Sequence, residues 1–264
     1  MISARNLVKK FGDFTAVNDI TFDVQQGEIF AFLGPNGAGK TTTIKILTTL
    51  LAATSGTVEI DGLNPATDQT EARKRFGIVF QDPSLDDELT AWENMDFHGA
   101  LYDVPRRLRR ERIAELLKMF DLWERRDDPV KQFSGGMRRR LEIARSFLHT
   151  PKIIFLDEPT LGLDPQTRNQ LWAHVKKLNQ ENNVTVFLTT HYMDEADRVA
   201  QRVAIIDHGV IVAQGTPAEL KQQTNSETLE AAFIALTGSS IREEEAGAID
   251  RMRNMSRMWR GNRR

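Results

Sequence analysis

The chain has 264 residues, 40% of them hydrophobic, and a formal net charge of −2 with a pI near 6.2. This balance does not favour nucleic acid or an anionic membrane surface as a partner. The absence of cysteine excludes disulfides, a thiol nucleophile and thiolate metal ligands. No stretch approaches about 18 consecutive apolar residues, so we expect no bilayer-spanning helix.

A phosphate-binding loop is predicted between a strand and a helix. Residues 34–41 read Gly-Pro-Asn-Gly-Ala-Gly-Lys-Thr and fit the pattern G-x-x-x-x-G-K-[ST]. The apolar run at 28–33 predicts a buried strand, and the residues from Thr42 to Leu47 open a helix. Both flanks disfavour a chance glycine-rich turn.

Each part of this loop has an expected chemical role. The glycines let backbone N–H groups point toward phosphate oxygens. Lys40 brings a positive charge to the terminal phosphates, and Thr41 brings a hydroxyl to a magnesium ion. The predicted phosphate-binding residues are Gly34, Pro35, Asn36, Gly37, Ala38, Gly39, Lys40, Thr41 and Thr42.

The middle of the chain, from about residue 82 to 150, is predicted to be mostly helical. Helical spacing covers 91–101 and 105–121, with Pro105 at a first helical position. Four aromatic or apolar side chains fit either the core of this segment or a groove for a partner. They are Trp92, Phe97, Leu101 and Tyr102.

A second anion site is predicted at 133–137, Phe-Ser-Gly-Gly-Met, because Ser134 is a good N-cap for the helix that follows. The chain thus has two phosphate-type sites. It has one acidic pair suited to magnesium, Asp157 and Glu158. This asymmetry suggests that each nucleotide is held by two chains or by two copies of the motif set.

The acidic pair ends a continuous apolar run at 152–156, which suits a strand buried on both faces. Open α/β sheets bind ligands at the carboxyl ends of their strands. Asp157 would hold magnesium, directly or through water, and Glu158 would orient or deprotonate the attacking water. A strand ending in an ordinary polar turn is the alternative.

Two more strands are predicted at 184–189 and 203–207. His191 lies just past the first. It is either a structural histidine or a donor to a terminal phosphate.

This ordered set of motifs resembles the ATP-binding cassette (ABC) ATPases over roughly residues 2–237. Residues 133–137 look like the family's Leu-Ser-Gly-Gly-Gln signature, and residues 161–164 match its D-loop. The resemblance implies that Gln81 serves the metal and the catalytic centre, that His191 is the switch histidine, and that Phe11 stacks on adenine.

The resemblance also implies a fold and a domain organisation. The fold is α/β: a P-loop NTPase core with a mainly parallel sheet, an N-terminal antiparallel β part and an inserted helical lobe at about 82–150. The ABC ATPase domain would span residues 1–237, with a C-terminal tail at 238–264. The implied cofactors are ATP and Mg²⁺, with hydrolysis by Lys40, Gln81, Glu158 and His191 and with metal ligands Thr41, Gln81 and Asp157.

The implied partners are a second ABC ATPase chain, as a homodimer, and an integral-membrane permease. In the head-to-tail dimer one chain binds the nucleotide and the other contributes Ser134, Gly135 and Gly136. The chain would be cytoplasmic and peripheral on the inner face of the cell membrane, touching the membrane through the permease and binding no nucleic acid.

Details of the sequence resemble cassettes of the drug-resistance (daunorubicin-exporter) type. They include Ser-Gly-Gly-Met-Arg-Arg-Arg at 134–140 and the segments 89–94 and 229–238. Met137 replaces the signature glutamine and removes a strong hydrogen-bonding group, and Leu161 replaces a small or polar D-loop residue. The alternatives are an importer cassette and a non-transport ABC ATPase acting on DNA or ribosomes. The single cassette and the short span from Gln81 to Ser134 disfavour the latter.

The tail changes composition after Gly238. Glu243–Glu245 are followed by six arginines after Asp250, with Ile249, Met252 and Trp259 near helical spacing. We expect either a docking helix or a solvated end.

Overall fold

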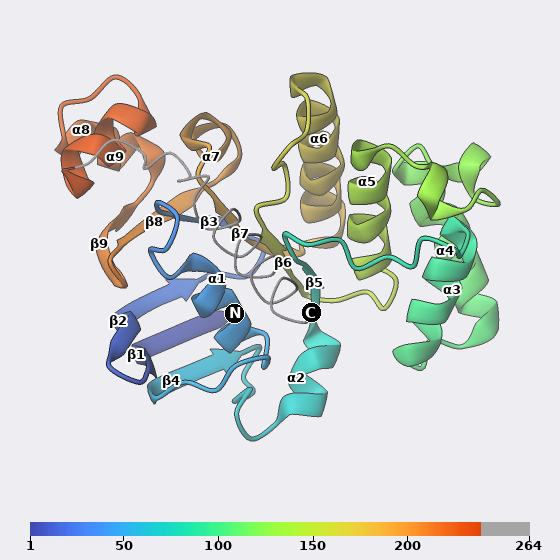
Figure 1. Ribbon diagram of the computed structural model, residues 1–264, viewed down its shortest axis with the longest axis horizontal. Coiled ribbons are helices and arrows are strands. Elements are labelled where there is room, and N and C mark those ends of the chain that lie inside the picture. The colour runs from blue at the N-terminus through green and yellow to red at the C-terminus, as the bar shows by residue number, and fades with distance from the viewer. Residues whose placement is uncertain (239–264) are drawn as a thin grey trace, which may run out of the picture.

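The computed structural model describes residues 1–238, which form two β-sheets and the helices that pack on them (Figure 1). The strands are β1 (Ile2–Phe11), β2 (Phe14–Val24), β3 (Ile29–Leu33), β4 (Ser55–Ile60), β5 (Phe76–Val79), β6 (Ile153–Asp157), β7 (Thr185–Thr190), β8 (Arg202–Asp207) and β9 (Val210–Gly215). The helices are α1 (Lys40–Leu47), α2 (Gln69–Arg75), α3 (Ala91–Leu101), α4 (Arg106–Met119), α5 (Gly135–Ser146), α6 (Pro165–Asn182), α7 (Met193–Val199), α8 (Pro217–Gln223) and α9 (Leu229–Thr237), with 3₁₀ turns at Trp123–Arg125 and Val130–Gln132. The predicted tail motifs at 239–264 lie outside the described residues.

The larger sheet has six strands in the order β5-β6-β7-β3-β8-β9. All neighbouring pairs are parallel except β8 and β9, which form an antiparallel pair. The smaller sheet is antiparallel, in the order β2-β1-β4, and lies at the lower left in Figure 1. The predicted α/β fold, with a mainly parallel core sheet and an antiparallel N-terminal part, is confirmed.

The core strands are apolar throughout because both faces of the sheet are covered. In β3, Ile29, Ala31 and Leu33 face one hydrophobic core, while Phe30 and Phe32 face the other. This alternation is the period of two expected of a strand.

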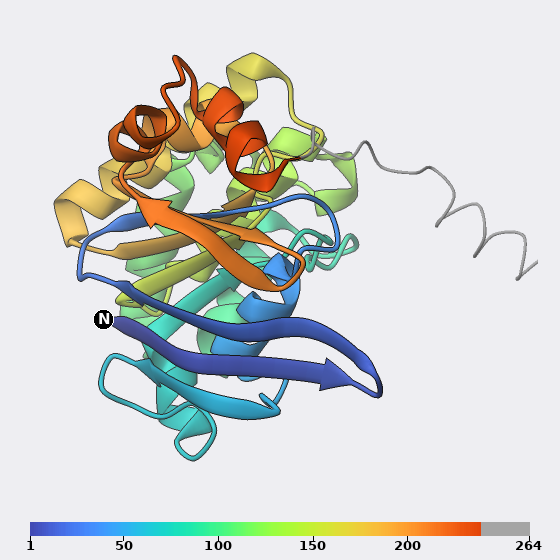
Figure 2. The same cartoon turned by 90° about the vertical axis from the view of Figure 1, so that its left-hand side faces the viewer.

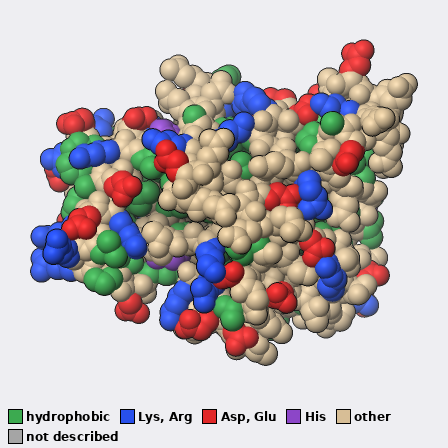
Figure 3. Space-filling view, turned by 180° about the vertical axis from the view of Figure 1, so that it is seen from behind, with side chains coloured by type: hydrophobic (Ala, Val, Ile, Leu, Met, Phe, Trp, Pro, Cys, Tyr) green, Lys and Arg blue, Asp and Glu red, His purple; other side chains and the backbone are tan. Residues whose placement is uncertain are grey.

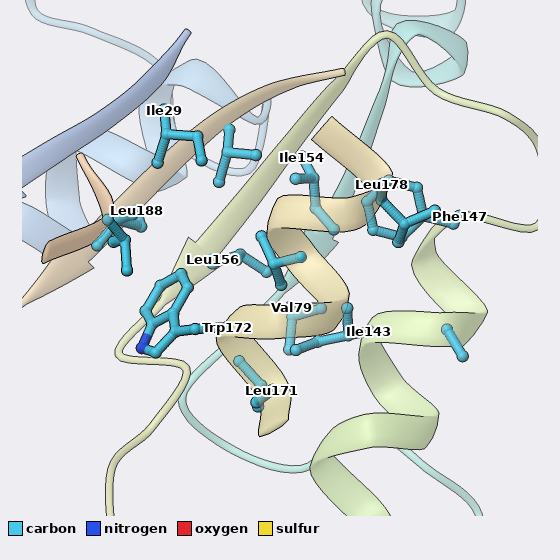
Figure 4. Close-up of a cluster of buried hydrophobic side chains, with 14 of the residues drawn as sticks. Ile29, Val79, Ile143, Phe147, Ile154, Leu156, Leu171, Trp172, Leu178 and Leu188 are labelled. Carbon is cyan, nitrogen blue, oxygen red and sulfur yellow. The ribbon is translucent and has the colours of Figure 1, made fainter. Parts of the chain in front are cut away.

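The first core lies between the sheet and the helices that cover it, where α5 and α6 pack on strand residues such as Ile154 and Leu156 (Figure 4). The second lies between the sheet, α1 and the antiparallel sheet (Figure 2). Phe22 of β2 packs there against Phe30, Phe32 and Phe187, with ring centroids 5.5–5.9 Å apart. Packing on both faces fixes the carboxyl edge of the sheet, where the site lies.

The helical lobe, α3 to α5, lies at the right in Figure 1. α3 starts at the predicted residue, where Thr90 and Glu93 form a capping box. The prediction that Pro105 takes the first helical position is wrong by one residue: Pro105 has an extended ψ of 137° and is the N-cap, so α4 begins at Arg106.

Of the four lobe side chains with two possible roles, two pack against other aromatic rings and two are exposed. Trp92 packs edge-on against Trp123, with centroids 6.5 Å apart, and Tyr102 stacks on His149 at 3.9 Å. Phe97 and Leu101 are 61% and 65% exposed. The last two therefore remain candidates for a partner surface.

Within residues 1–238, no helix combines the length and the hydropathy needed to cross a membrane. On the face shown in Figure 3, basic and acidic side chains are intermingled.

Candidate functional site

The phosphate loop joins β3 to α1, and the packing of the chain itself requires two of its glycines. A Cβ on Gly34 would lie 2.3 Å from a carbonyl oxygen of β8, and one on Gly39 would lie 2.6 Å from a carbonyl oxygen of β2. Gly39 also has φ of +110° and is the N-cap of α1. The helix therefore begins at Lys40, two residues before the expected start at Thr42, and its free N–H groups lie at the loop.

Lys40 is buried, and its ammonium connects the loop to the carboxylate pair. Nζ donates to the carbonyl oxygens of Gly34 at 2.7 Å and Pro35 at 3.3 Å. It also lies 3.3 Å from Oε1 of Glu158. A cation in such a buried place interacts strongly with a nearby anion, because the local dielectric is low.

Asp157 ends β6 and is 1% exposed. Its Oδ1 accepts hydrogen bonds from Thr189 Oγ1 at 2.5 Å and Thr41 Oγ1 at 3.4 Å. Burial raises the pKa of the Asp157 carboxyl, and the two hydroxyls oppose this. Sequence reasoning missed Thr189, although a hydroxyl residue ending the strand beside β6 was an available signal.

Glu158 has an unusual backbone, with φ of +48°. Its N–H donates to both the carbonyl and the hydroxyl oxygen of Thr189, each at 3.1 Å. Its Oε2 lies 2.9 Å from Nδ1 of His191. Burial would raise the pKa of the Glu158 carboxyl, but His191 and Lys40 hold that pKa below its usual value. The carboxylate is therefore ionised near neutral pH, as a group that orients or deprotonates water must be.

These side chains meet at a pocket of about 250 Å³. Most of the predicted site residues line it: Pro35, Asn36, Gly37, Gly39, Lys40, Thr41, Thr42, Gln81, Glu158 and His191. Phe14, Ala16 and Leu161, which were not predicted as site residues, also line it. The pocket is thus lined by the phosphate loop, the carboxylate turn and His191, which are far apart in the sequence.

Two exposed aromatic rings lie near this pocket. Phe11 ends β1 and pairs across the hairpin with Phe14, and their side chains are 49% and 64% exposed. Phe14 lines the pocket; Phe11 does not, and the ammonium of Lys9 lies 4.9 Å from its ring centroid. Stacking of Phe11 on adenine stays a prediction, and Phe14 is a second candidate.

The signature turn is a separate site in this chain. Ser134 caps α5, as expected, and accepts a hydrogen bond from the N–H of Met137 at 3.3 Å. A Cβ on Gly136 would lie 2.6 Å from the side chain of Thr167, whereas one on Gly135 would meet no atom of the described residues within 4 Å. The open end of α5 is therefore accessible to another molecule.

The signature turn does not line the phosphate pocket. Gly135 lines an adjoining pocket of about 190 Å³, which shares Gln81, Glu158 and Leu161 with the first. Both pockets lie on the same side of the molecule.

The oxygen donors near Thr41 fit a magnesium ion. The Thr41 hydroxyl and the Asp157 carboxylate are within 3.4 Å of each other, and Gln81 lines the same pocket. Carboxylate and other oxygen ligands are those that Mg²⁺ prefers.

Known sequences similar to this chain are ATP-binding proteins of transporters. The family described as ABC transporter matches residues 17–161. The daunorubicin/doxorubicin resistance ATP-binding protein DrrA of Streptomyces peucetius is 45% identical over 228 residues, covering 86% of this chain and 69% of that protein. The linearmycin resistance ATP-binding protein LnrL of Bacillus subtilis is 40% identical, covering 94% and 78%. The resemblance to the daunorubicin-resistance type is confirmed.

Solved structures agree with the fold. An ATP-binding subunit of an ABC transporter superimposes with a TM-score of 0.81 at 28% identity, covering 89% of this chain and 99% of that one. A dimeric ATP-binding cassette in a post-hydrolysis state with ADP and Pi gives 0.73 at 32% identity, covering 82% and 98%. The chain therefore belongs to the ABC transporter family and is one of its ATP-hydrolysing enzymes.

Proposed function

We propose that the chain is the ATP-binding and hydrolysing subunit of an ABC exporter, which dimerises head to tail over two Mg-ATP and drives a separate permease. The exporter direction is supported by the names of its relatives. Two confer resistance to daunorubicin/doxorubicin and linearmycin, and a third, from Ralstonia nicotianae, is a Nod factor export ATP-binding protein at 40% identity.

The main observation in support of a dimer is that the two predicted anion sites do not line the same pocket within one chain. The phosphate pocket contains Lys40 and Glu158 but no residue of 134–136. The start of α5 has an open backbone at Gly135 and no acidic residue in its first turn. Such a helix end suits the phosphates of a nucleotide bound by another chain. The cassette solved with ADP and Pi is dimeric.

The geometry supports a role for each residue in the pocket. Backbone N–H groups of the loop and the Lys40 ammonium would bind the terminal phosphates. Glu158 would accept a proton from the attacking water, or orient it. His191 is held through Nδ1, so its Nε2 would face the terminal phosphate.

Thr41, Gln81 and Asp157 would hold Mg²⁺, which when bound neutralises part of the phosphate charge. ATP would favour the closed dimer by touching both chains, and hydrolysis would remove that link. This difference in affinity can shift a permease between two states. The chain would lie on the inner face of the membrane through that permease.

Replacing Glu158 with glutamine tests this assignment. The amide cannot take a proton, while Lys40 and the loop remain. We expect ATP affinity within about threefold of wild type, turnover reduced by at least about 100-fold, and an ATP-dependent dimer in light scattering. The double variant Glu158→Gln/Lys40→Ala is the matched control, and it should not dimerise with ATP. Turnover of Glu158→Gln within about threefold of wild type would contradict the role of Glu158.

Capture of the chain from its native membranes tests the partner. We expect one integral-membrane chain to copurify in an ATP-sensitive manner. Copurification with ribosomal or DNA-repair proteins instead would contradict the exporter assignment.

A further inference from the structure

The turn that carries Glu158 is held from behind by a buried arginine of α5. Arg139 is 8% exposed. Its Nε donates to the carbonyl oxygen of Pro159 at 2.8 Å, and its Nη2 donates to those of Asp157 at 3.0 Å and Glu158 at 3.1 Å. One guanidinium thus binds the carbonyl oxygens of three successive residues.

The same guanidinium also reaches the segment that contains Gln81. Its Nη1 donates to the carbonyl oxygen of Phe80 at 2.5 Å and to Oε2 of Glu142 at 3.1 Å. Glu142 is 3% exposed, and its Oε1 accepts the N–H of Ser84 at 2.7 Å. Two charges three residues apart on one helix therefore connect the segment 80–84 to the turn 157–159.

The backbone of this turn needs such support. A φ of +48° is uncommon for a residue other than glycine, and such conformations persist where the surroundings hold them. Thr189 binds the N–H of Glu158, while Arg139 binds its carbonyl oxygen. Removal of the guanidinium would leave the carbonyl oxygens of Asp157, Glu158 and Pro159 without this donor.

We propose that Arg139 is a positioning residue for ATP hydrolysis: it holds the turn 157–159 so that Glu158 faces the phosphate pocket. Glu142 ties this support to the segment after Gln81. The inference rests on the proposed function, in which Glu158 acts on water. Because Arg139 belongs to α5, which begins at the signature turn, the orientation of the Glu158 carboxylate would also depend on the position of that helix.

Replacement of the pair tests the inference without leaving a buried charge unpaired. In Arg139→Met/Glu142→Gln the glutamine still accepts the N–H of Ser84, but the carbonyl oxygens of 157–159 lose their donor. We expect kcat to fall about 100-fold, since small misplacements of a catalytic group have effects of this size. The KM for ATP and the affinity for a fluorescent ATP analogue should stay within about threefold.

Arg139→Lys is the conservative variant, and its kcat tests the inference even if the double variant does not fold. Its ammonium keeps the charge opposite Glu142 but cannot reach five acceptors, so we expect kcat about tenfold below wild type. Arg140→Met is the matched control on the same helix, because Arg140 donates to the carbonyl oxygen of Phe120, at 3.0 Å, inside the lobe. Its kcat should stay within about threefold of wild type.

A combination with Glu158→Gln separates positioning from simple stabilisation. If Arg139 acts through the carboxylate, Arg139→Lys should slow single-turnover hydrolysis by less than about twofold in the Glu158→Gln background. A full tenfold loss there, a wild-type kcat in Arg139→Lys, or a loss that appears in KM instead of kcat would overturn the inference. Wild-type hydrolysis by Glu158→Gln alone would overturn the proposed function instead.

Discussion

The phosphate loop and the signature turn are both glycine-rich segments before a helix, but Gly34 and Gly39 of the loop differ from Gly135 of the turn in what surrounds them. Gly34 and Gly39 are fixed by the fold, because a Cβ at either position would approach a backbone oxygen closer than 3.0 Å. Gly135 is not, because a Cβ there would meet no atom of residues 1–238 within 4 Å and its φ is not positive. The loop also has a buried ammonium, whereas the first turn of α5 has no acidic side chain.

This difference is consistent with our proposal that one site is complete within the chain and that the other requires a second chain. The fold does not require a glycine at position 135, and the missing side chain leaves room for another molecule at the N-terminus of α5. The proposed two-chain site follows from this contrast. The predictions below would break or refine it, from the largest expected effect to the smallest.

Ser134→Arg should abolish hydrolysis, with a loss of more than about 100-fold, and leave nucleotide binding by the single chain unchanged. The larger side chain would cover the end of α5, while position 134 does not line the phosphate pocket. ATPase assays and titration with a fluorescent ATP analogue measure the two effects. If the isolated variant lost nucleotide binding, the two-site contrast would be wrong.

Mixing this variant with Lys40→Ala provides the control. In a mixed head-to-tail dimer, one site combines the intact loop of the first chain with the intact signature of the second. Hydrolysis by the mixture should exceed that of either variant alone. Mixtures no more active than their components would indicate that each site belongs to one chain.

Lys40→Ala alone should weaken nucleotide binding itself, by roughly 10- to 100-fold. Removing one member of a charged, hydrogen-bonded contact in a buried place costs about 1.5–3 kcal/mol. Isothermal titration with ATP measures the change. Lys45→Ala is the control, since Lys45 lies on the same helix and does not line the pocket. Unchanged affinity in Lys40→Ala would remove the loop from the binding site.

Much of this architecture was readable from local sequence patterns. Continuous apolar runs marked β3, β6, β7 and β8 because these strands are covered on both faces. Ser134 marked the start of α5, because an N-cap satisfies N–H groups within a few residues of itself. Such signals need no knowledge of tertiary contacts.

The parts that were missed depend on tertiary packing. Residues 138–140 are three successive arginines, and each points 100° away from the next around the helix. Only Arg139 falls on the buried face that also carries Glu142, Ile143 and Ser146, and its function depends on carbonyl oxygens about 20 residues away. The early start of α1 likewise follows from the left-handed conformation of Gly39.

Acid should destabilise the chain through two largely buried histidines, His98 of α3 and His149, which follows the carboxyl end of α5. Burial lowers the pKa of His98 to about 3 and that of His149, just after α5, to about 4. Both titrate near 6.5 when unfolded, so the unfolded chain binds more protons below that pH. The free energy of unfolding should be highest above pH 7 and fall by about 2 kcal/mol per histidine on going to pH 5. Urea unfolding at each pH measures this loss.

His98→Leu is the matched variant for that measurement. It removes one of the two groups from a buried cluster where Nε2 of His98 has no hydrogen-bond partner among residues 1–238. The loss between pH 7 and pH 5 should therefore be about half that of wild type. An identical loss in both proteins would mean that His98 does not carry the acid sensitivity.

The smallest expected effect concerns the nucleotide base. It tests whether the chain that binds the phosphates also supplies the aromatic ring that stacks on the base. Phe11→Ala should weaken ATP binding by about 1–2 kcal/mol, as expected for lost stacking and apolar contact, and Phe11→Tyr should be nearly neutral. Phe14→Ala is the matched comparison, because Phe14 faces Phe11 across the hairpin and lines the pocket. A loss confined to Phe14→Ala would assign the stacking to that ring.

The affinities should change equally in the Ser134→Arg background, since the ring and the phosphate loop belong to the same chain. If the Phe11 effect disappeared there, the base would be contacted across the dimer.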